Sequence, residues 1–541
     1  MKTSKSVTIA SCIEIIQYVK YFYYLLLLGV VLTNVLVVSG CAGNSSISST
    51  QIATTCTNLA GKTINDVTIT STKWFEASSG NPAFCQVNAT RAPYLDMEID
   101  VPENWSGRLW QQGGGGLDGK IPSAITIDAA TGAITDVNIA LKDGLSVYAA
   151  SNGGNRASVP AQAAPLVWAN GTLEGVASAV DYAYASLQTT GEFAKAVTKS
   201  FYGKLPDRTY FNGCSNGGRN AYIAAERSPL EYDGIVSGCE TMDITGQTSA
   251  WMNLGSRVGT TAMPSSAQWS AIAAAAISAC DALDGVTDGI IANQSACTFD
   301  VSTLQCGQIT ASTDPAICLT SAQAQTVKDL TSDLKLANNT TIYSGFNWTD
   351  WSPYVPYFGV LGGGYALLAT GDQTWFTQLT KQQSFNLNRD YRTFQFGLHM
   401  GGLDHDKSKI ASYVASGKKL ISWHDGSDNL VSINDHIRNY ATMTNIAKGL
   451  GLTNPSTNTR FFIVPGGSHS EGQALTEVNW FSAITNWVEL NIAPEQLIYN
   501  KRDKITGLVL RTLPVCQYPK YPRYNGAGDV NSAESYTCTT P

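Results

Sequence analysis

A serine at the centre of a Gly-x-Ser-x-Gly run is the strongest candidate for chemistry in this 541-residue chain. The run is Gly213–Gly217, and Ser215 lies at its centre. The apolar segment 209–212 predicts a strand before it, and segment 217–226 predicts a helix after it. A tight strand-to-helix turn with small flanking residues exposes a serine hydroxyl at the edge of a sheet. The motif therefore predicts a nucleophile. The alternative is a glycine-rich turn without chemistry.

The histidines come next, because a serine hydroxyl is a poor nucleophile until a base takes its proton. His469 follows the apolar run Phe461–Val464, so we expect it to emerge at the carboxyl edge of a sheet. The other four histidines fit structural positions. His424 fits a strand end, His436 a helix beginning near Ile433, and His399 and His405 the end of an insertion. We therefore predict that His469 is the base.

An acid should orient this base, and it should lie on the loop after the preceding strand. The predicted strand Leu420–Trp423 is followed by two candidates, Asp425 and Asp428. Spacing alone does not choose between them.

Backbone N–H groups must hold the oxyanion that forms during acyl transfer. The run Gly113–Gly116 follows the predicted strand Arg108–Gln111, and only glycine lets several N–H groups turn towards one point there. It resembles the glycine-rich oxyanion loop of esterases. We predict Gly115 and the N–H of Asn216 as the donors. A flexible glycine loop is the alternative.

Three carboxylates lie within eight residues further along the chain, at Asp281, Asp284 and Asp288. Hard oxygen ligands that converge on one point suit Ca²⁺, although the spacing is not that of an EF-hand. The flanking Cys280 and Cys297 favour a fixed site. A solvated Asp-Gly turn explains the same spacing equally well.

The order of elements predicts an α/β fold. Short apolar runs, read as buried parallel strands, alternate with helical patterns such as Leu173–Leu187. The alternation fails between about 243 and 400, which we interpret as an insertion between two strands of one sheet.

Composition indicates an exported protein that does not bind nucleic acid. Only 14% of residues are charged, the formal net charge is −7, and no basic run is present. Setting aside Cys12 and Cys41, ten cysteines remain, and an even number in an exported chain predicts disulfides.

The first 40 residues read as a signal peptide, because lysines precede the apolar stretch Tyr21–Gly40. This stretch is also long enough for an uncleaved membrane anchor. It ends Val38–Cys41, which resembles a bacterial lipoprotein cleavage box, so Cys41 would carry lipid and attach the protein to a membrane. Ordinary cleavage and free secretion are the alternative.

Together these residues resemble the tannase and feruloyl esterase family, a branch of the α/β-hydrolase fold. The resemblance runs from about Cys56 to Cys538. The matching segments are Gly107–Gly116, Phe211–Arg219, Tyr232–Ser237, Cys280–Cys297, Leu420–Leu430, Phe462–His469 and Arg511–Cys538.

The resemblance implies that Asp428 is the acid of the triad. It also implies that 243–400 is a lid, with hydrolase segments 41–242 and 401–541 on either side. Within the lid it implies structural Ca²⁺ bound by the three carboxylates and by two carbonyls. This ligand set is Asp281, Asp284, Val286, Asp288 and Ile290.

One departure concerns the cysteines. The family has a cysteine before the serine and another after the histidine, joined by a disulfide, whereas here Ser470 follows His469. We expect Cys214 to pair instead with Cys239, at the end of the neighbouring strand, with two buried free thiols as the alternative. The remaining cysteines fall into sequential pairs: Cys56–Cys85, Cys280–Cys297, Cys306–Cys318 and Cys516–Cys538.

The expected function is that of a secreted serine carboxylesterase acting through an acyl-enzyme. The resemblance implies small esters of hydroxylated aromatic acids, such as ferulate or gallate, attached to plant polysaccharide or polyphenol. Alternatives are a hydrolase of terephthalate monoesters, a peptidase, or a non-catalytic binding protein stabilised by calcium. Four aromatic residues of the lid could line the acid pocket or simply belong to a core: Trp348, Trp351, Phe394 and Phe396.

Overall fold

The structure, a computed structural model, describes residues 49–541 apart from 79, 158–167, 169, 241 and 504–505. Residues Ser49–Pro541 form one compact unit. The predicted signal peptide 1–40 and Cys41 lie outside the described residues. Within the described part, no helix is both long and apolar enough to cross a membrane.

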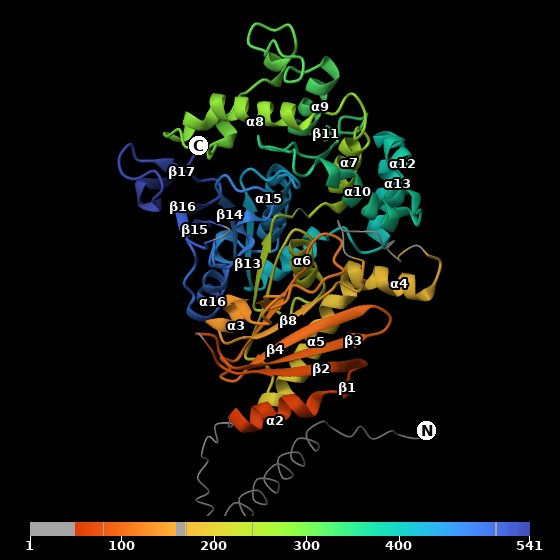
Figure 1. The fold of residues 1–541 in the computed structure, drawn as a ribbon, viewed down its shortest axis with the longest axis vertical. Coiled ribbons are helices and arrows are strands. Elements are labelled where there is room, and N and C mark those ends of the chain that lie inside the picture. Colours follow the sequence, from red (N-terminus) through yellow and green to blue (C-terminus); the bar gives the residue numbers. More distant parts are fainter. Residues whose placement is uncertain (1–48, 79, 158–167, 169, 241, 504–505) are drawn as a thin grey trace, which may run out of the picture. The chain divides into compact units, whose positions relative to one another are not determined.

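A twelve-stranded mixed sheet forms the centre of this unit, in the order β1-β2-β3-β4-β8-β5-β9-β10-β13-β14-β16-β15 (Figure 1). Adjacent strands from β8 to β14 run parallel, and the strands on both flanks are antiparallel. The parallel strands are almost wholly buried, as their apolar runs predict. The predicted α/β class is confirmed.

The strands of this sheet are β1 Thr63–Ile64, β2 Val67–Phe75, β3 Phe84–Arg91, β4 Leu95–Pro102, β5 Arg108–Gln112, β8 Val147–Ser151, β9 Arg208–Cys214, β10 Gly234–Gly238, β13 Lys419–Asp425, β14 Thr459–Val464, β15 Gln496–Arg502 and β16 Val509–Gln517. Three two-stranded sheets accompany it, formed by β6 Ile125–Ile127 with β7 Ile134–Val137, β11 Leu334–Lys335 with β12 Thr341–Tyr343, and β17 Tyr521–Tyr524 with β18 Tyr536–Thr539.

The helices either pack on the sheet or belong to segment 243–400, as α8 and α9 do (Figure 1). They are α2 Ser49–Leu59, α3 Ile139–Lys142, α4 Leu173–Val180, α5 Ser186–Tyr202, α6 Asn216–Arg227, α7 Ile244–Gly255, α8 Ser266–Cys280, α9 Ser321–Thr331, α10 Val355–Thr370, α11 Thr374–Thr377, α12 Leu379–Gln383, α13 Leu387–Met400, α14 Lys407–Ala415, α15 Ile433–Gly449 and α16 Trp480–Leu490. The predicted helix Leu173–Leu187 is α4 continued by a π-helical turn into α5. The helix predicted near Ile433 is α15.

Segment 243–400, called the insertion below, leaves the sheet after β10 and returns before β13, and these two strands are neighbours. Its apolar residues, among them Trp269, Trp351 and Phe358, form one core with residues outside the insertion, such as Leu117 and Tyr182. The indole N–H of Trp251 donates to the carbonyl of Leu430 at 2.7 Å, so the insertion contacts the loop after β13. The exact boundaries of the predicted segments 41–242, 243–400 and 401–541 remain a prediction.

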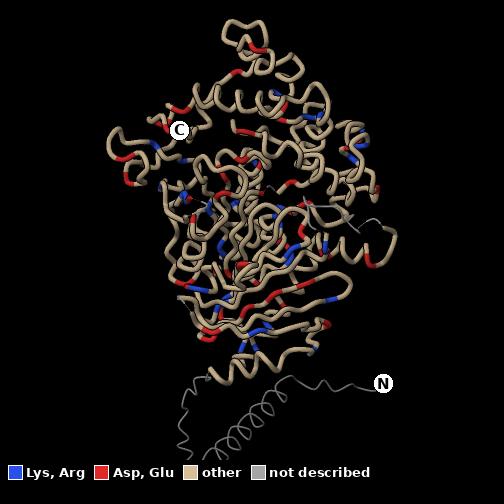
Figure 2. Tube along the Cα trace, viewed as in Figure 1, with Lys and Arg blue, Asp and Glu red and all other residues tan. Residues whose placement is uncertain are grey.

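Four disulfides join the predicted sequential pairs: Cys56–Cys85, Cys280–Cys297, Cys306–Cys318 and Cys516–Cys538. The fifth predicted pair is wrong for this structure, because Cys214 and Cys239 are both buried free thiols. Charged residues of both signs are interspersed along the described chain (Figure 2).

Candidate active site

The candidate nucleophile, Ser215, lies in a sharp turn between β9 and α6. Its φ of 59° and ψ of −128° are strained values for a residue with a side chain. The turn tolerates only glycine on both sides. A Cβ on Gly213 would lie 2.3 Å from the carbonyl oxygen of Gly217, and a Cβ on Gly217 would lie 2.6 Å from that of Gly114. The Gly-x-Ser-x-Gly spacing is therefore a steric requirement of this turn.

The structure brings the three residues of the predicted triad together. Nε2 of His469 lies 3.0 Å from Oγ of Ser215, and Nδ1 of the same ring lies 2.8 Å from Oδ2 of Asp428. This is the chain of hydrogen bonds by which a buried acid orients a base towards a serine. His469 is 8% exposed, so the base is shielded but accessible to a small substrate.

Of the two competing acids, Asp428 is the one in contact with the candidate base. Its Oδ1 accepts the N–H groups of Leu430 and Val431, both at 2.8 Å. Burial alone would raise the pKa of Asp428, but the charge of His469 and hydrogen bonds from His424 and His469 outweigh it and lower that pKa well below the usual range. The carboxylate is therefore ionised at neutral pH in the folded protein.

A row of buried polar side chains in contact with one another continues behind this acid. Nε2 of His424 lies 3.1 Å from Oδ2 of Asp428, and its Nδ1 lies 2.9 Å from Nδ1 of His436. Nε2 of His436 contacts the hydroxyl of Tyr222, which lies 2.8 Å from Oγ of Ser422. Burial lowers the pKa of His436 well below its usual value. His424 lies at a strand end, as the sequence predicts, but it also contacts the candidate acid, which no local sequence signal indicates.

The predicted oxyanion loop packs directly on the first turn of α6. The N–H of Gly113 is already used, donating to the carbonyl of Asn212 at 2.8 Å. By contrast, the N–H of Gly114 donates to no backbone carbonyl among the described residues, and the N–H of Gly115 donates towards the carboxyl of Asp118, whose pKa this bond lowers. The N–H of Asn216 belongs to the first helical turn, which has no intrahelical acceptor. Of the two predicted donors, Asn216 therefore has an N–H without an intrahelical acceptor, whereas the N–H of Gly115 already contacts the carboxyl of Asp118.

A buried carboxyl, missed by sequence reasoning, joins the oxyanion loop to the turn that carries the serine. Oδ1 of Asp118 accepts a hydrogen bond from Nδ2 of Asn216 at 2.6 Å, and the N–H of Asp118 donates to the carbonyl of Gly115 at 2.9 Å. Burial raises the pKa of Asp118 to about 7, although the bond from Asn216 opposes this rise. Asp118 thus fixes both predicted oxyanion donors relative to each other.

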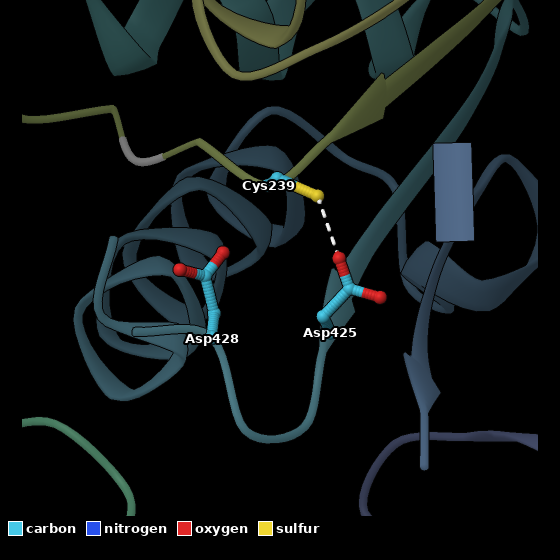
Figure 3. Close-up of side chains that lie close together, drawn as sticks. All are labelled: Cys239, Asp425 and Asp428. Carbon is cyan, nitrogen blue, oxygen red and sulfur yellow. Dashed lines mark hydrogen bonds between the residues drawn. The ribbon is translucent and has the colours of Figure 1, made fainter. Parts of the chain in front are cut away.

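The thiols of Cys214 and Cys239 lie close enough to affect each other's pKa, but they do not form the predicted disulfide, and each has a further partner. In the register of β9 and β10, Cys214 lies opposite Gly238 rather than Cys239. Cys239 has a φ of 51°, and its Sγ lies 3.2 Å from Oδ2 of Asp425 (Figure 3). Sγ of Cys214 instead lies 3.2 Å from Oγ of Ser470. Burial raises the pKa of both thiols, so both remain protonated.

The aromatic residues singled out from the sequence have different environments. Trp351 and Phe394 are fully buried in the core of the insertion, and Phe396 is 70% exposed. Trp348 is partly buried and packs edge-on against Phe299.

The aromatic residue that contacts the candidate site is one that sequence reasoning missed, Tyr354. Its hydroxyl donates to the carbonyl of His469 at 3.4 Å, and the two rings pack edge to face. The insertion therefore reaches the candidate base through this residue.

The predicted calcium ligands lie in one turn bracketed by the Cys280–Cys297 disulfide. Asp281 accepts the N–H groups of Gly289 and Ile290 at 2.9 and 3.2 Å. Asp288 accepts a bond from the guanidinium of Arg511 at 2.7 Å. Burial, followed by the nearby Asp288 and Asp281, raises the pKa of Asp284 to about 7.

Only Asp288 of the three carboxylates pairs with a guanidinium, so negative charge is in excess in this turn, and the hard oxygens fit Ca²⁺. They do not form a tight cluster. Among the described residues, the only set of at least three possible ligand atoms lying within 4.8 Å of one another is that of Cys239, Asp425 and Asp428 (Figure 3). That set is fully buried and includes the acid of the candidate triad.

Known proteins resemble this chain over most of its length. Mono(2-hydroxyethyl) terephthalate hydrolase of Piscinibacter sakaiensis is 27% identical over 85% of each chain. A probable feruloyl esterase B of Emericella nidulans is 26% identical over 93% of this chain and 98% of its own. The crystal structure of feruloyl esterase B from Aspergillus oryzae matches with a TM-score of 0.74 at 21% identity, covering 90% of this chain and 100% of that one.

The structural likeness confirms the predicted α/β-hydrolase fold. Residues 79–539 match the family described as tannase and feruloyl esterase. The chain belongs to the tannase and feruloyl esterase family.

Proposed function

We propose that this carboxylic ester hydrolase cleaves esters of hydroxylated aromatic acids through a Ser-His-Asp triad and an acyl-enzyme. The observation that carries the proposal is the pair of hydrogen bonds from His469 to Ser215 and to Asp428, at 3.0 and 2.8 Å. The strained turn under Ser215 supports it, since such strain is common at nucleophiles.

In the proposed reaction, Oγ of Ser215 attacks the ester carbonyl while Nε2 of His469 takes the hydroxyl proton. Asp428 stabilises the imidazolium that results. The N–H groups of Gly115 and Asn216 hold the oxyanion. Collapse of the tetrahedral intermediate breaks the carbonyl–alkoxy bond, and the alcohol leaves with the proton from His469. Water then repeats the steps on the acyl-enzyme, releases the aromatic acid and restores the serine.

The aromatic acid is proposed from family membership and from the names of the relatives, which include a feruloyl esterase and a terephthalate-monoester hydrolase. The test is kcat/KM for methyl ferulate, methyl gallate, mono(2-hydroxyethyl) terephthalate and a peptide amide, measured for the wild type and Ser215→Ala. We expect turnover of at least one aromatic ester, abolished in the variant. Equal, low rates for both proteins would support a non-catalytic binding protein instead, and preference for the peptide would indicate a peptidase.

We also propose export and a structural Ca²⁺. Four disulfides support an oxidising compartment. Asp281, Asp284 and Asp288, with the carbonyls of Val286 and Ile290, would hold the ion and stabilise the insertion. Mass spectrometry of the N-terminus of the mature protein tests whether Cys41 carries lipid.

A further inference from the structure

A fully buried arginine, Arg219, lies on the helix that follows the candidate nucleophile. Its backbone N–H donates to the carbonyl of Ser215 at 3.0 Å, so it lies one helical turn beyond the serine. A charged group away from water is costly unless its donors find acceptors. The triad makes no use of this guanidinium, so its burial requires an explanation of its own.

The guanidinium makes four hydrogen bonds, and these reach two separate segments. On α6, Nε donates to Oδ1 of Asn216 at 2.7 Å, and Nη2 donates to Oδ1 of Asn220 at 3.1 Å. Towards α5, Nη1 donates to the carbonyl of Ala183 at 2.8 Å and Nη2 to that of Tyr182 at 2.6 Å. Because the fork of an arginine is planar and rigid, these acceptors hold the two segments in one fixed relation.

The two backbone acceptors belong to the π-helical turn Asp181–Ala185 between α4 and α5. The N–H of Ser186 bonds to the carbonyl of Asp181, five residues back. A turn of this kind interrupts the regular α-helical ladder, and a side chain can then bond to the backbone there. Arg91 anchors the start of the turn through an ion pair with Asp181. The turn is therefore a fixed support to which Arg219 bonds.

The π-helical turn is itself bonded to the glycine loop of the candidate site. The hydroxyl of Tyr182 donates to the carbonyl of Gly116 at 3.1 Å, and the face of its ring lies 4.8 Å from the guanidinium carbon of Arg219. Arg219 thus contacts the residue that bonds to the loop Gly113–Gly116. On this side it acts on the predicted oxyanion loop through one intermediate residue.

On the other side Arg219 holds the side chain of Asn216 in one orientation. Arginine only donates, so the amide oxygen of Asn216 must face it, and the amide NH₂ must then face Asp118, whose Oδ1 accepts it at 2.6 Å. Burial raises the pKa of Asp118 to about 7, and the nearby charge of Arg219 opposes this rise. The amide of Asn216 is therefore held at both ends.

We propose that Arg219 is a positioning residue for the oxyanion: it holds the first turn of α6, through Asn216, against the glycine loop, through Tyr182. This inference rests on the proposed function, in which N–H groups from both sides must point at one oxygen. Such donors act because they are fixed in advance, and a displacement of about 1 Å costs about 100-fold in rate. A lysine keeps the charge but lacks the planar fork that joins the two segments.

The test compares variants at the two ends of this connection, with methyl ferulate as substrate. Arg219→Lys should lower kcat about 10- to 100-fold with little change in KM, because the oxyanion forms only in the transition state. Asn216→Ala keeps the backbone N–H and should cost a similar factor. The double variant should be no slower than the slower single variant, because removing either end already breaks the connection.

Arg227→Lys is the matched control. Arg227 is an exposed arginine on the same helix, and its guanidinium carbon lies 3.9 Å from the ring centre of Tyr184 in the same π-helical turn. The control variant should keep the kcat of the wild type, because Arg227 has no bond to Asn216 or to the carbonyls of the turn among the described residues.

A transition-state analogue gives a readout that a merely structural role would not change. Oγ of Ser215 adds to the carbonyl carbon of an aromatic trifluoromethyl ketone, the C=O electron pair moves onto oxygen, and His469 takes the hydroxyl proton. The resulting anionic oxygen lies where the oxyanion lies. The Ki of this ketone should rise in Arg219→Lys by the factor by which kcat/KM falls. The Kd of free ferulate should stay unchanged.

The outcomes separate this inference from the proposed function. If the wild type hydrolyses no aromatic ester, the proposed function fails and this inference fails with it. If the wild type is active but Arg219→Lys and Asn216→Ala keep its kcat, or if their effects multiply in the double variant, only this inference is overturned. The same holds if kcat falls while the Ki of the ketone does not change.

A second pair of variants decides the matter if circular dichroism shows that Arg219→Lys does not fold. Asn216→Ala leaves the other three hydrogen bonds of Arg219 in place. Tyr182→Phe removes the hydroxyl that bonds to Gly116 and should lower kcat about two- to tenfold. An unchanged kcat in both of these folded variants would overturn the proposal.

Discussion

One carboxylate oxygen, Oδ2 of Asp428, contacts two histidines: Nδ1 of His469 at 2.8 Å and Nε2 of His424 at 3.1 Å. Together these two contacts keep the carboxylate ionised in spite of complete burial. The orientation of the candidate base therefore depends on a second histidine, which is itself fully buried and lies behind the acid.

Substitutions in the triad should have unequal effects. We expect Ser215→Ala and His469→Ala each to lower kcat by about 10⁶, because these residues form and activate the nucleophile. Asp428→Asn should cost about 10⁴, because the acid orients and stabilises the base without bonding to the substrate. Single-turnover rates on methyl ferulate check the order. If kcat is unchanged in Asp428→Asn, another residue must be the acid of the triad.

His424→Leu should lower kcat about tenfold with little change in KM. The variant removes a hydrogen bond to the charged Asp428, and such bonds contribute about 1.5–3 kcal/mol. Steady-state kinetics with the same ester measure the split between kcat and KM. His399→Leu, at an exposed position of α13, is the control. A variant that loses only stability, with kcat unchanged, would contradict this role for His424.

The sequence was sufficient to predict the parallel strands and the residues at their carboxyl ends. Apolar runs such as 209–212 and 460–464 correspond to β9 and β14 because both faces of these strands are covered. Local chemistry also singled out Ser215 and His469, which the structure brings into contact. The choice between Asp425 and Asp428 needed either the family resemblance or the structure, because both follow the same run of strand residues.

Contacts between distant segments could not be predicted. The antiparallel strands β2–β4 and β15–β16 depend on cross-strand pairing, which leaves only a weak pattern in each strand. Tyr354 reaches His469 across 115 residues, and Asp118 reaches Asn216 across 98. The prediction of a Cys214–Cys239 disulfide treated neighbouring strands as sufficient, but Cys239 lies one residue beyond the position opposite Cys214, and both thiols are free.

The raised pKa of Asp118 predicts a pH dependence of stability. Its pKa is about 7 in the folded protein against 3.8 for an unperturbed carboxyl, so the folded state binds the extra proton between these values. Stability from this group is therefore lost as pH rises from about 4 to 7, by up to about 1.4 kcal/mol per pH unit. Asp118→Asn should lose this slope.

Urea denaturation of the wild type and Asp118→Asn at pH 5 and pH 8 measures the effect. The free energy of unfolding of the wild type, relative to the variant, should be smaller at pH 8. Wild type and variant share the other buried acids with raised pKa values, such as Asp284, so the contributions of those acids to the free energy of unfolding cancel in this difference. A difference that is equal at both pH values would contradict the assignment to Asp118.

Calcium should stabilise the fold without taking part in the chemistry. An ion at about 100 times its Kd adds about 2.7 kcal/mol to the native state, which raises Tm by about 5 °C at most in a chain of this size. Chelation followed by calorimetry measures the shift, and elemental analysis measures bound metal. Asp281→Asn should remove the response, whereas Asp300→Asn, an exposed acid nearby in sequence, should keep it. An unchanged Tm after chelation, together with no calcium in the purified protein, would contradict the proposed calcium site.

Cys214 and Cys239 should be recovered as free thiols, and the other eight described cysteines as four disulfides. Each thiol has its own partner, Ser470 or Asp425, and burial keeps both protonated and unreactive. We therefore expect no alkylation of the folded protein and alkylation of both after unfolding without reductant. Peptide mapping identifies the labelled residues, and Cys516 and Cys538, which are disulfide-bonded, serve as the internal control. A linked Cys214–Cys239 peptide would instead show that the two thiols are oxidised to a disulfide, and that the turn under Ser215 is braced covalently.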